Sequence, residues 1–180
     1  MKNIMMISLG LGLLAGVAHA DTPKAPEAPK PPQEVADMAK AMSGSWTCTG
    51  KADMGGTMLD VKGTVTHKID LEGWWIQTTI TSTAGKMPGA MHMTFMTTYD
   101  GASKKWYRET ANSMGGHGTA WGTQADKKMS WEGEGRFSGT DVKSRYAEET
   151  VSAKEVHLSG EYSKDGGKTW KPDHDVSCKK

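Results

Sequence analysis

The strongest constraint on the fold is a two-residue alternation of apolar and polar side chains that begins near residue 45 and continues to the end of the chain. The alternation is clearest over residues 59–69, where Leu59, Val61 and Val65 alternate with charged and hydroxyl-bearing side chains. Successive side chains of a β-strand point to opposite faces, so this pattern predicts strands with one dry and one wet face.

Turn-forming pairs such as Gly55-Gly56, Asp100-Gly101 and Gly115-Gly116 interrupt the alternation at the spacing of an antiparallel meander. The predicted strands are residues 45–54, 58–69, 73–83, 90–99, 104–113, 117–124, 128–136, 141–151, 154–163 and 169–178. About ten consecutive strands with one apolar face exceed what a flat sheet usually sustains. We therefore expect an all-β fold in which the strands close into an antiparallel up-and-down barrel.

The two cysteines bear directly on barrel closure. Cys48 lies near the start of the first predicted strand, two residues after Trp46, and Cys178 lies near the end of the last strand, two residues after Val176. Antiparallel pairing of these strands brings the two cysteines together on the inner face. In an oxidising compartment this arrangement predicts a Cys48–Cys178 disulfide. Two neighbouring free thiols are the alternative.

The N-terminal part divides into three segments. Residues 1–20 combine Lys2, an apolar stretch and an Ala-His-Ala ending, which is the pattern of a cleavable signal peptide and predicts a periplasmic or secreted protein. Residues 21–33 hold five of the seven prolines and predict an extended linker. Residues 34–42 show helical spacing, so a short helix precedes the barrel domain, which we assign to residues 34–180.

Charge excludes some partners. The chain has 22 Lys and Arg residues against 21 Asp and Glu residues, and loss of Lys2 with the signal peptide leaves these charges balanced. Nucleic acid is therefore not an expected partner. The apolar stretch of residues 4–17 is short for a membrane span, so no transmembrane segment is expected in the mature protein. The oligomeric state stays open.

Several short motifs resemble a known family. They are Gly44-Ser45-Trp46, Tyr99-Asp100-Gly101, Lys104-Lys105-Trp106, Ser113-Met114-Gly115-Gly116 and Gly167-Lys168-Thr169-Trp170. Together they resemble the bacterial lipocalin-like family called domain of unknown function 1579. The resemblance implies a calycin-type barrel around a cavity and no established activity. The chain departs from true lipocalins in the last strand, where lysines replace the arginine that covers the tryptophan.

Residues 163–170 also match the Asp-box hairpin of sialidase propellers. A propeller repeats this motif in every blade, and here it occurs once. We interpret it as a structural turn between the last two strands, in which Asp165 binds turn amides and Trp170 packs beneath them.

The inward positions of the strands predict a cavity lined by aromatic and sulfur-containing side chains. The expected lining residues are Trp46, Trp74, Ile76, Met91, Met93, Phe95, Trp121, Met129, Trp131, Val156, Leu158 and Tyr162. Such a lining favours a small apolar or amphipathic ligand and a non-catalytic role in binding or transport. A cavity filled by its own side chains, in a purely structural or interaction module, is an alternative.

Methionine and histidine suggest a second function. The chain has 13 methionines and only two phenylalanines. Loops expected at one end of the barrel hold Met54, Met58, Met87, Met91, Met114 and His117. Thioether and imidazole groups suit Cu(I), so copper binding is an alternative to the use of methionine as a flexible apolar filler. No cofactor is expected in the favoured interpretation.

The alternation places His67, His117 and His174 on inner faces and His92 and His157 on outer faces. His67 and His117 are expected at opposite ends of the barrel, too far apart to share an ion. A single inward histidine, His117 or His174, is a candidate haem ligand, and an ordinary interior histidine is the alternative.

The sequence offers little support for catalysis. It contains no recognisable nucleophile motif, metal-protease motif or phosphate loop. Asp173 and Asp175 flank His174 on one strand, and alternation predicts that both carboxylates point away from the histidine. Glu132 and Glu134 share an outer face, which is typical of solvated charge. We therefore expect that the protein is not an enzyme.

Overall fold

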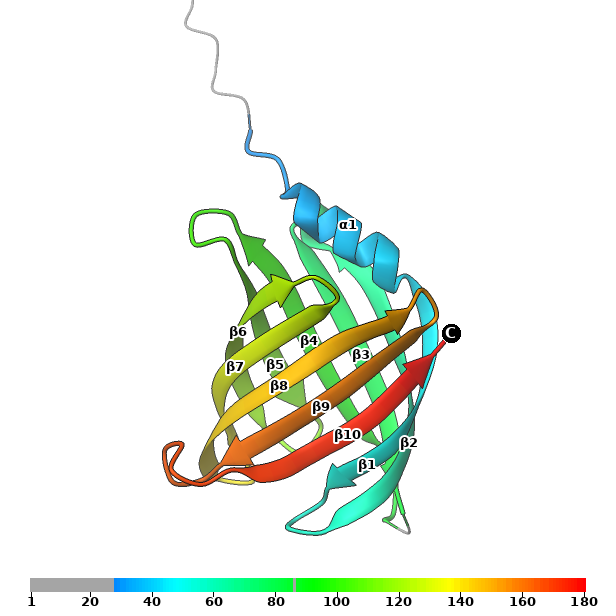
Figure 1. Cartoon of the computed structure of the whole chain (residues 1–180), viewed down its shortest axis with the longest axis vertical. Helices are drawn as coiled ribbons and strands as arrows, with labels where there is room; N and C mark the ends of the chain where they lie inside the picture. The colour runs from blue at the N-terminus through cyan, green and yellow to red at the C-terminus, as the bar shows by residue number, and fades with distance from the viewer. Residues whose placement is uncertain (1–27, 86) are drawn as a thin grey trace, which may run out of the picture.

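The computed structural model describes residues 28–85 and 87–180, so the predicted signal peptide and residues 21–27 of the linker lie outside the described residues. Within these residues, one α-helix, α1 (Gln33–Met42), precedes ten strands (Figure 1). The strands are β1 (Gly44–Asp53), β2 (Met58–Asp70), β3 (Trp75–Ala84), β4 (Met91–Asp100), β5 (Lys105–Asn112), β6 (His117–Ala125), β7 (Lys128–Phe137), β8 (Thr140–Ser152), β9 (Glu155–Ser163) and β10 (Lys171–Lys179).

The predicted up-and-down barrel is confirmed. Each strand pairs antiparallel with the next one along the chain, and β1 pairs with β10 to close the barrel. In that last pair Cys48 lies directly opposite Cys178, and the predicted disulfide joins them. The cross-link therefore lies on the seam where the first and last strands meet.

The predicted strand bounds differ from the observed ones mainly before β3 and β10. A short 3-10 turn, η1 (Leu71–Gly73), delays β3 until Trp75, because the Asp70 carboxylate accepts a hydrogen bond from the Leu71 amide and holds the turn. The turn after β9 delays β10 until Lys171 in the same way. There Asp165 accepts hydrogen bonds from the amides of Lys168 and Thr169.

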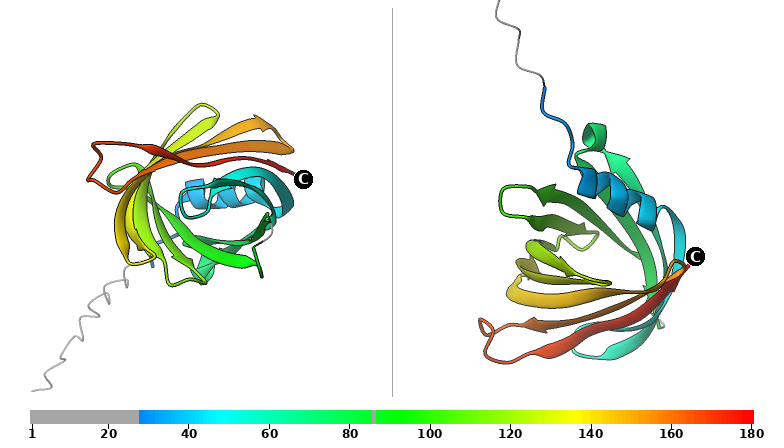
Figure 2. Two further views of the ribbon diagram at one scale, coloured as in Figure 1. Left: turned by 90° about the horizontal axis from the view of Figure 1, so that it is seen from below. Right: turned by 45° about the horizontal axis from the view of Figure 1, so that its top comes forward.

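Helix α1 lies across one end of the barrel (Figure 1), and Figure 2 shows it from two further directions. The predicted short helix is confirmed, and it turns Val35 and Ala39 into the core with Met38 packed beside them. A hydrogen bond links the end of α1 to the start of β1, because the Trp46 indole donates to the Met42 carbonyl oxygen at 2.9 Å. Lys180 donates to the Ala41 carbonyl oxygen at 3.1 Å.

Two clusters form the core. The first lies beneath α1 and combines Val35 and Ala39 with Ile76, Trp106, Ala120, Met129 and Trp131. The second lies at the barrel seam and combines Trp46 with the disulfide, and Val65, Val156, Leu158 and Val176 pack against it. No helix in the described part of the chain is long and apolar enough to cross a membrane.

Candidate functional site

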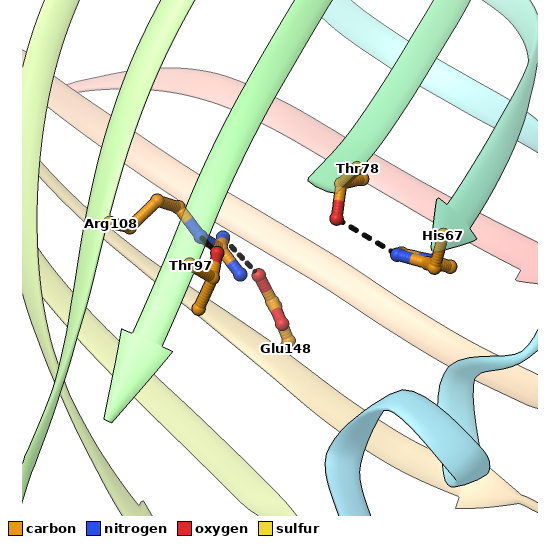
Figure 3. Close-up of polar contacts among 5 residues, drawn as sticks. All are labelled: His67, Thr78, Thr97, Arg108 and Glu148. Carbon is orange, nitrogen blue, oxygen red and sulfur yellow. Dashed lines mark hydrogen bonds and ion pairs between the residues drawn. The ribbon is translucent and has the colours of Figure 1, made fainter. Parts of the chain in front are cut away.

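The interior of the barrel holds a buried charged side chain that the sequence analysis did not single out. Arg108 lies on the inner face of β5 and is 3% exposed. Its Nε donates to Thr97 Oγ1 on β4 at 3.1 Å, and its Nη1 donates to Glu148 Oε1 on β8 at 2.5 Å (Figure 3). The Arg108–Glu148 ion pair therefore spans the barrel between strands that are not neighbours.

Aromatic rings surround the Arg108 guanidinium. Its Cζ lies 3.9 Å from the Trp131 ring centroid and 4.9 Å from that of Phe95. The Tyr146 ring stacks on Trp131 with a centroid separation of 5.9 Å. A cation above an aromatic face is attracted by the ring quadrupole, and desolvation strengthens that attraction. The charge is therefore held by one carboxylate and by the faces of the interior rings.

The surroundings keep Arg108 protonated. Burial by itself would lower the pKa of Arg108, but the Glu148 carboxylate and the Tyr146 hydroxyl outweigh it and raise the pKa. Burial also raises the pKa of Tyr146, so this phenol stays neutral beside the guanidinium. The Arg108 guanidinium therefore stays positively charged beside the Glu148 carboxylate.

His67 on β2 is a further ionisable group of this region. Its Nδ1 lies 2.9 Å from Thr78 Oγ1 on β3 (Figure 3). Burial is the main cause that lowers the pKa of His67 to about 4, and the charges of Arg108 and Lys180 lower it further against the opposing effect of Glu148. The imidazole is therefore uncharged at neutral pH, and its predicted inward position is confirmed.

Arg108, Glu148 and His67 line an internal cavity of about 80 Å³. The polar lining consists of His67, Thr78, Arg108 and Glu148. The rest of the lining is apolar and comes from α1, the core cluster at the barrel seam and the neighbouring strands: Met42, Trp46, Val65, Ile80, Phe95, Val156, Leu158 and Cys178. The cavity thus combines a mainly apolar lining with two pairs of polar side chains, Arg108–Glu148 and His67–Thr78.

A larger groove of about 760 Å³ lies elsewhere, along β5 to β8 and the turn after β9. Its charged lining residues, among them Glu109, Glu134 and Arg136, belong to the outer faces of their strands and are exposed. Arg136 pairs with Asp141 in water, and such exposed pairs contribute little binding energy. The interior cavity is the better candidate site because its polar groups are desolvated.

Most of the predicted lining residues lie on inner faces. Trp46, Ile76, Met129 and Trp131 are buried in the two core clusters. Five more are half-buried on the inner faces of β4 and β9, namely Met91, Met93, Phe95, Leu158 and Tyr162, and Val156 joins them. Trp46, Phe95, Val156 and Leu158 line the cavity itself. Trp74 lies outside the strands, in the turn before β3, and is half-buried.

The prediction that Trp121 lines the cavity is wrong. Its side chain is 46% exposed on the outer face of β6, where its ring packs 4.9 Å from that of Tyr107. The inner face of β6 instead presents Gly122, because a Cβ there would lie 2.6 Å from the Trp131 ring. Trp131 thus fills the space on the inner face of β6, and the inward position predicted for Trp121 is wrong.

The same correction applies to His117. It lies on the outer face of β6, four residues before Trp121, and is exposed. Its Nδ1 lies 3.3 Å from the Gly115 carbonyl oxygen. His117 therefore cannot be the inward haem ligand that alternation suggested, because its whole strand face points to solvent.

The predicted methionine set lies in the turns at the barrel end opposite α1. Met54 and Met58 border the β1–β2 turn, Met87 follows β3, and Met114 lies between β5 and β6. The last two are 48% and 60% exposed. Among residues 28–85 and 87–180, no group of three or more His, Cys, Asp or Glu side chains converges as a metal site. Copper or haem binding stays a prediction.

His174 is half-buried on the inner face of β10, with its ring 6.3 Å from that of Tyr146. The prediction that both flanking carboxylates point away from it is wrong for Asp173, whose Oδ2 lies 2.8 Å from His174 Nδ1. A register shift between Pro172 and His174 breaks the alternation there. Asp175 does point away and pairs with His157 on the outside.

The Asp-box turn behaves as predicted. Asp165 accepts hydrogen bonds from the amides of Lys168 and Thr169 and from the Thr169 hydroxyl. These bonds lower the pKa of Asp165. The half-buried Trp170 donates its indole N–H to the Gly167 carbonyl oxygen, and Arg145 stacks over its ring. The motif is therefore structural.

Arg108, Glu148 and Thr97 were not predicted as site residues from the sequence. A usable signal was present: Arg108 follows Trp106 at the same parity, and Glu148 follows Tyr146 at the same parity. A charged residue at an inward position is informative, because such residues are seldom buried unless they are paired. Two of opposite sign on the inner faces of one barrel predict an interior ion pair.

No protein-family model matches this chain, and no curated protein matches it either. The family resemblance of the short motifs therefore stays a prediction. Independently of this resemblance, the structure shows a closed ten-stranded barrel with an internal disulfide and polar side chains in its cavity.

Proposed function

We propose that this protein is an exported, non-catalytic binding protein that holds one small amphipathic ligand inside its barrel. The proposal rests on one observation: apolar side chains and buried polar side chains line the same cavity. Ligand sites commonly combine a mainly apolar lining with a few placed polar groups that orient the ligand.

The size of the cavity limits the ligand. Its volume of about 80 Å³ lies well below the roughly 300 to 1,000 Å³ of sites for drug-sized molecules. Only a polar head and the first few carbons of a chain fit within this volume, because a benzene ring already occupies a cavity of about 150 Å³. Met42 at the end of α1 lines the cavity, so a longer apolar tail would displace this helix end first.

The state of the polar groups favours binding over catalysis. Arg108 and Glu148 are committed to each other, and His67 Nδ1 contacts Thr78. A general base works best when its pKa lies near the operating pH, and the pKa of His67 is about 4. These groups are better suited to orienting a ligand than to moving its protons.

The disulfide supports the export part of the proposal. Disulfides persist in the periplasm and outside the cell and are rare in reducing cytosol. The Cys48–Cys178 bond therefore agrees with the signal-peptide pattern of residues 1–20. The proposed location is the periplasm or the medium.

Filling the cavity tests the proposal. Isothermal titration calorimetry of the mature, disulfide-bonded protein with 1-hexanol should show saturable binding. Ile80→Phe adds a ring to the cavity wall and should abolish that binding, whereas Thr79→Phe adds the same ring at an exposed neighbouring position and should not. Equal binding by the wild type and Ile80→Phe would place the ligand elsewhere and refute the proposal.

A further inference from the structure

We infer that the ligand held in this cavity has an uncharged polar head, such as an alcohol hydroxyl, rather than a carboxylate or an ammonium group. The inference rests on the proposed function and names the chemical class of ligand for that same site. It follows from the charge balance of the cavity and from the hydrogen-bonding atoms that remain available.

The charges of the cavity already cancel. Arg108 and Glu148 form one ion pair at 2.5 Å. The other ionisable group among the lining residues is His67, which burial keeps neutral. Cys178 belongs to the disulfide and does not titrate. The lining that the structure describes therefore has no net charge to offer a ligand.

An ionised head would be the third charge in this space. Burying an ion is unfavourable unless a partner of opposite charge compensates it. A carboxylate would have to compete with Glu148 for Arg108, and an ammonium would have to compete with Arg108 for Glu148. Either competition leaves one protein charge without its partner.

A neutral head meets no such competition. Glu148 uses Oε1 to accept from Arg108, and its Oε2 has no hydrogen-bond partner in the described part of the chain and is not fully buried. His67 contacts Thr78 through Nδ1, which leaves Nε2 as its second polar atom. A hydroxyl can donate to a carboxylate oxygen or bond to an imidazole nitrogen without bringing a charge into the cavity, so it suits either atom.

The surrounding geometry keeps the ion pair intact when a ligand enters. Thr97 holds Arg108 Nε at 3.1 Å, and the rings of Phe95 and Trp131 flank the guanidinium. The pair is thus fixed by contacts that a ligand in the cavity does not replace. The ligand head must adapt to the pair, and a neutral group can do so.

A matched set of ligands tests the inference. 1-Hexanol, hexanoate and hexylammonium share one alkyl chain and differ in the charge of the head. Calorimetric titration of the mature, disulfide-bonded protein at pH 7 should give at least tenfold tighter binding of 1-hexanol than of either ion. This comparison uses the wild type alone, so it does not depend on the folding of a variant.

Glu148→Gln provides a second test. It keeps the shape of the side chain but leaves Arg108 without its carboxylate, so hexanoate should bind at least tenfold more tightly than it binds the wild type. Glu149→Gln, at the next and exposed position of β8, should behave like the wild type. Thermal unfolding gives an independent measurement, because hexanoate should raise the melting temperature of Glu148→Gln and not that of Glu149→Gln.

The outcomes separate the inference from the proposed function. If hexanoate or hexylammonium binds the wild type as tightly as 1-hexanol, the inference is overturned and the proposed function stands. If Glu148→Gln folds and gains nothing for hexanoate, the charge-balance argument is wrong. If none of the three compounds binds, the proposed function fails and the inference fails with it.

Discussion

At the scale of single residues, Arg108 organises the barrel interior. A buried charge is tolerated only when it is paired and hydrogen-bonded, and Arg108 meets this requirement through Glu148, Thr97 and three aromatic rings. The buried indole N–H of Trp131, by contrast, has no hydrogen-bond partner in the described residues. Packing and the neighbouring cation, rather than a hydrogen bond, therefore orient that ring.

Breaking the ion pair should be costly. Arg108→Met leaves the Glu148 carboxylate buried without its partner and should lower the free energy of unfolding by about 3 to 5 kcal/mol. Arg108→Met combined with Glu148→Leu should recover most of that loss, since neither charge remains. Urea unfolding measures both variants. Arg136→Met, at the exposed Arg136–Asp141 pair, is the control and should cost less than about 1 kcal/mol.

His67 should make stability depend on pH. Its pKa is about 4 in the folded protein and 6.5 in the unfolded chain, so the unfolded chain binds a proton first as the pH falls. Above pH 6.5 the imidazole is uncharged in both states, so His67 costs no stability there. The free energy of unfolding should fall by about 3 kcal/mol between pH 6.5 and 4.

Urea unfolding at pH 7 and at pH 4.5 tests this expectation. His67→Asn, whose amide can contact Thr78, should remove much of the difference between the two pH values. His92→Asn, at the outer-face histidine, should retain it. An unchanged pH dependence in His67→Asn would assign the effect to other groups.

At the scale of elements, β6 shows how one strand can be inverted relative to its predicted faces. The strand carries Trp121 outward and glycine inward, against the usual preference for a buried tryptophan. The neighbouring β7 explains this arrangement, because Trp131 already occupies the space above Gly122. Which of two adjacent tryptophans is buried depends on this contact between strands and not on either strand alone.

Gly122 is therefore expected to be sensitive to substitution. Gly122→Ala places a methyl group against the Trp131 ring and should lower stability by about 1 to 3 kcal/mol through overpacking. Gly101→Ala is the control, because a Cβ at that position has no atom within 4 Å. Chemical denaturation of the two variants measures the difference in their free energies of unfolding. Equal values would show that the Trp131 ring moves aside without loss of stability.

At the scale of the whole molecule, one covalent bond joins the two ends of the sheet. The disulfide links residues 130 positions apart across the β1–β10 seam. On the chain-entropy account, closing so long a loop stabilises the fold by about 4 to 5 kcal/mol.

Cys48→Ala combined with Cys178→Ala should therefore lower the free energy of unfolding by about that amount, measured by guanidinium denaturation. Wild-type protein in a reducing buffer is the matched comparison and should show a similar loss. A loss below about 1 kcal/mol in both would mean that backbone pairing and packing alone hold the seam.

Much of this architecture could be predicted from local sequence. Strand bounds agree within two residues along the chain, because alternation and turn residues act over a few neighbouring positions. The disulfide was predictable because antiparallel closure places Cys48 opposite Cys178. The two late strand starts depend on side-chain hydrogen bonds of Asp70 and Asp165, which shorten the strands locally.

The candidate site was not predictable in the same way. Alternation assigns faces, but it does not say that Arg108 on β5 reaches Glu148 on β8, or that His67 loses its charge beside them. The Arg108–Glu148 contact joins residues 40 positions apart. It exists only once the barrel has closed. Short-range patterning therefore defines strands, turns and seam, whereas the interior charge balance and the choice of buried tryptophan arise from packing between distant strands.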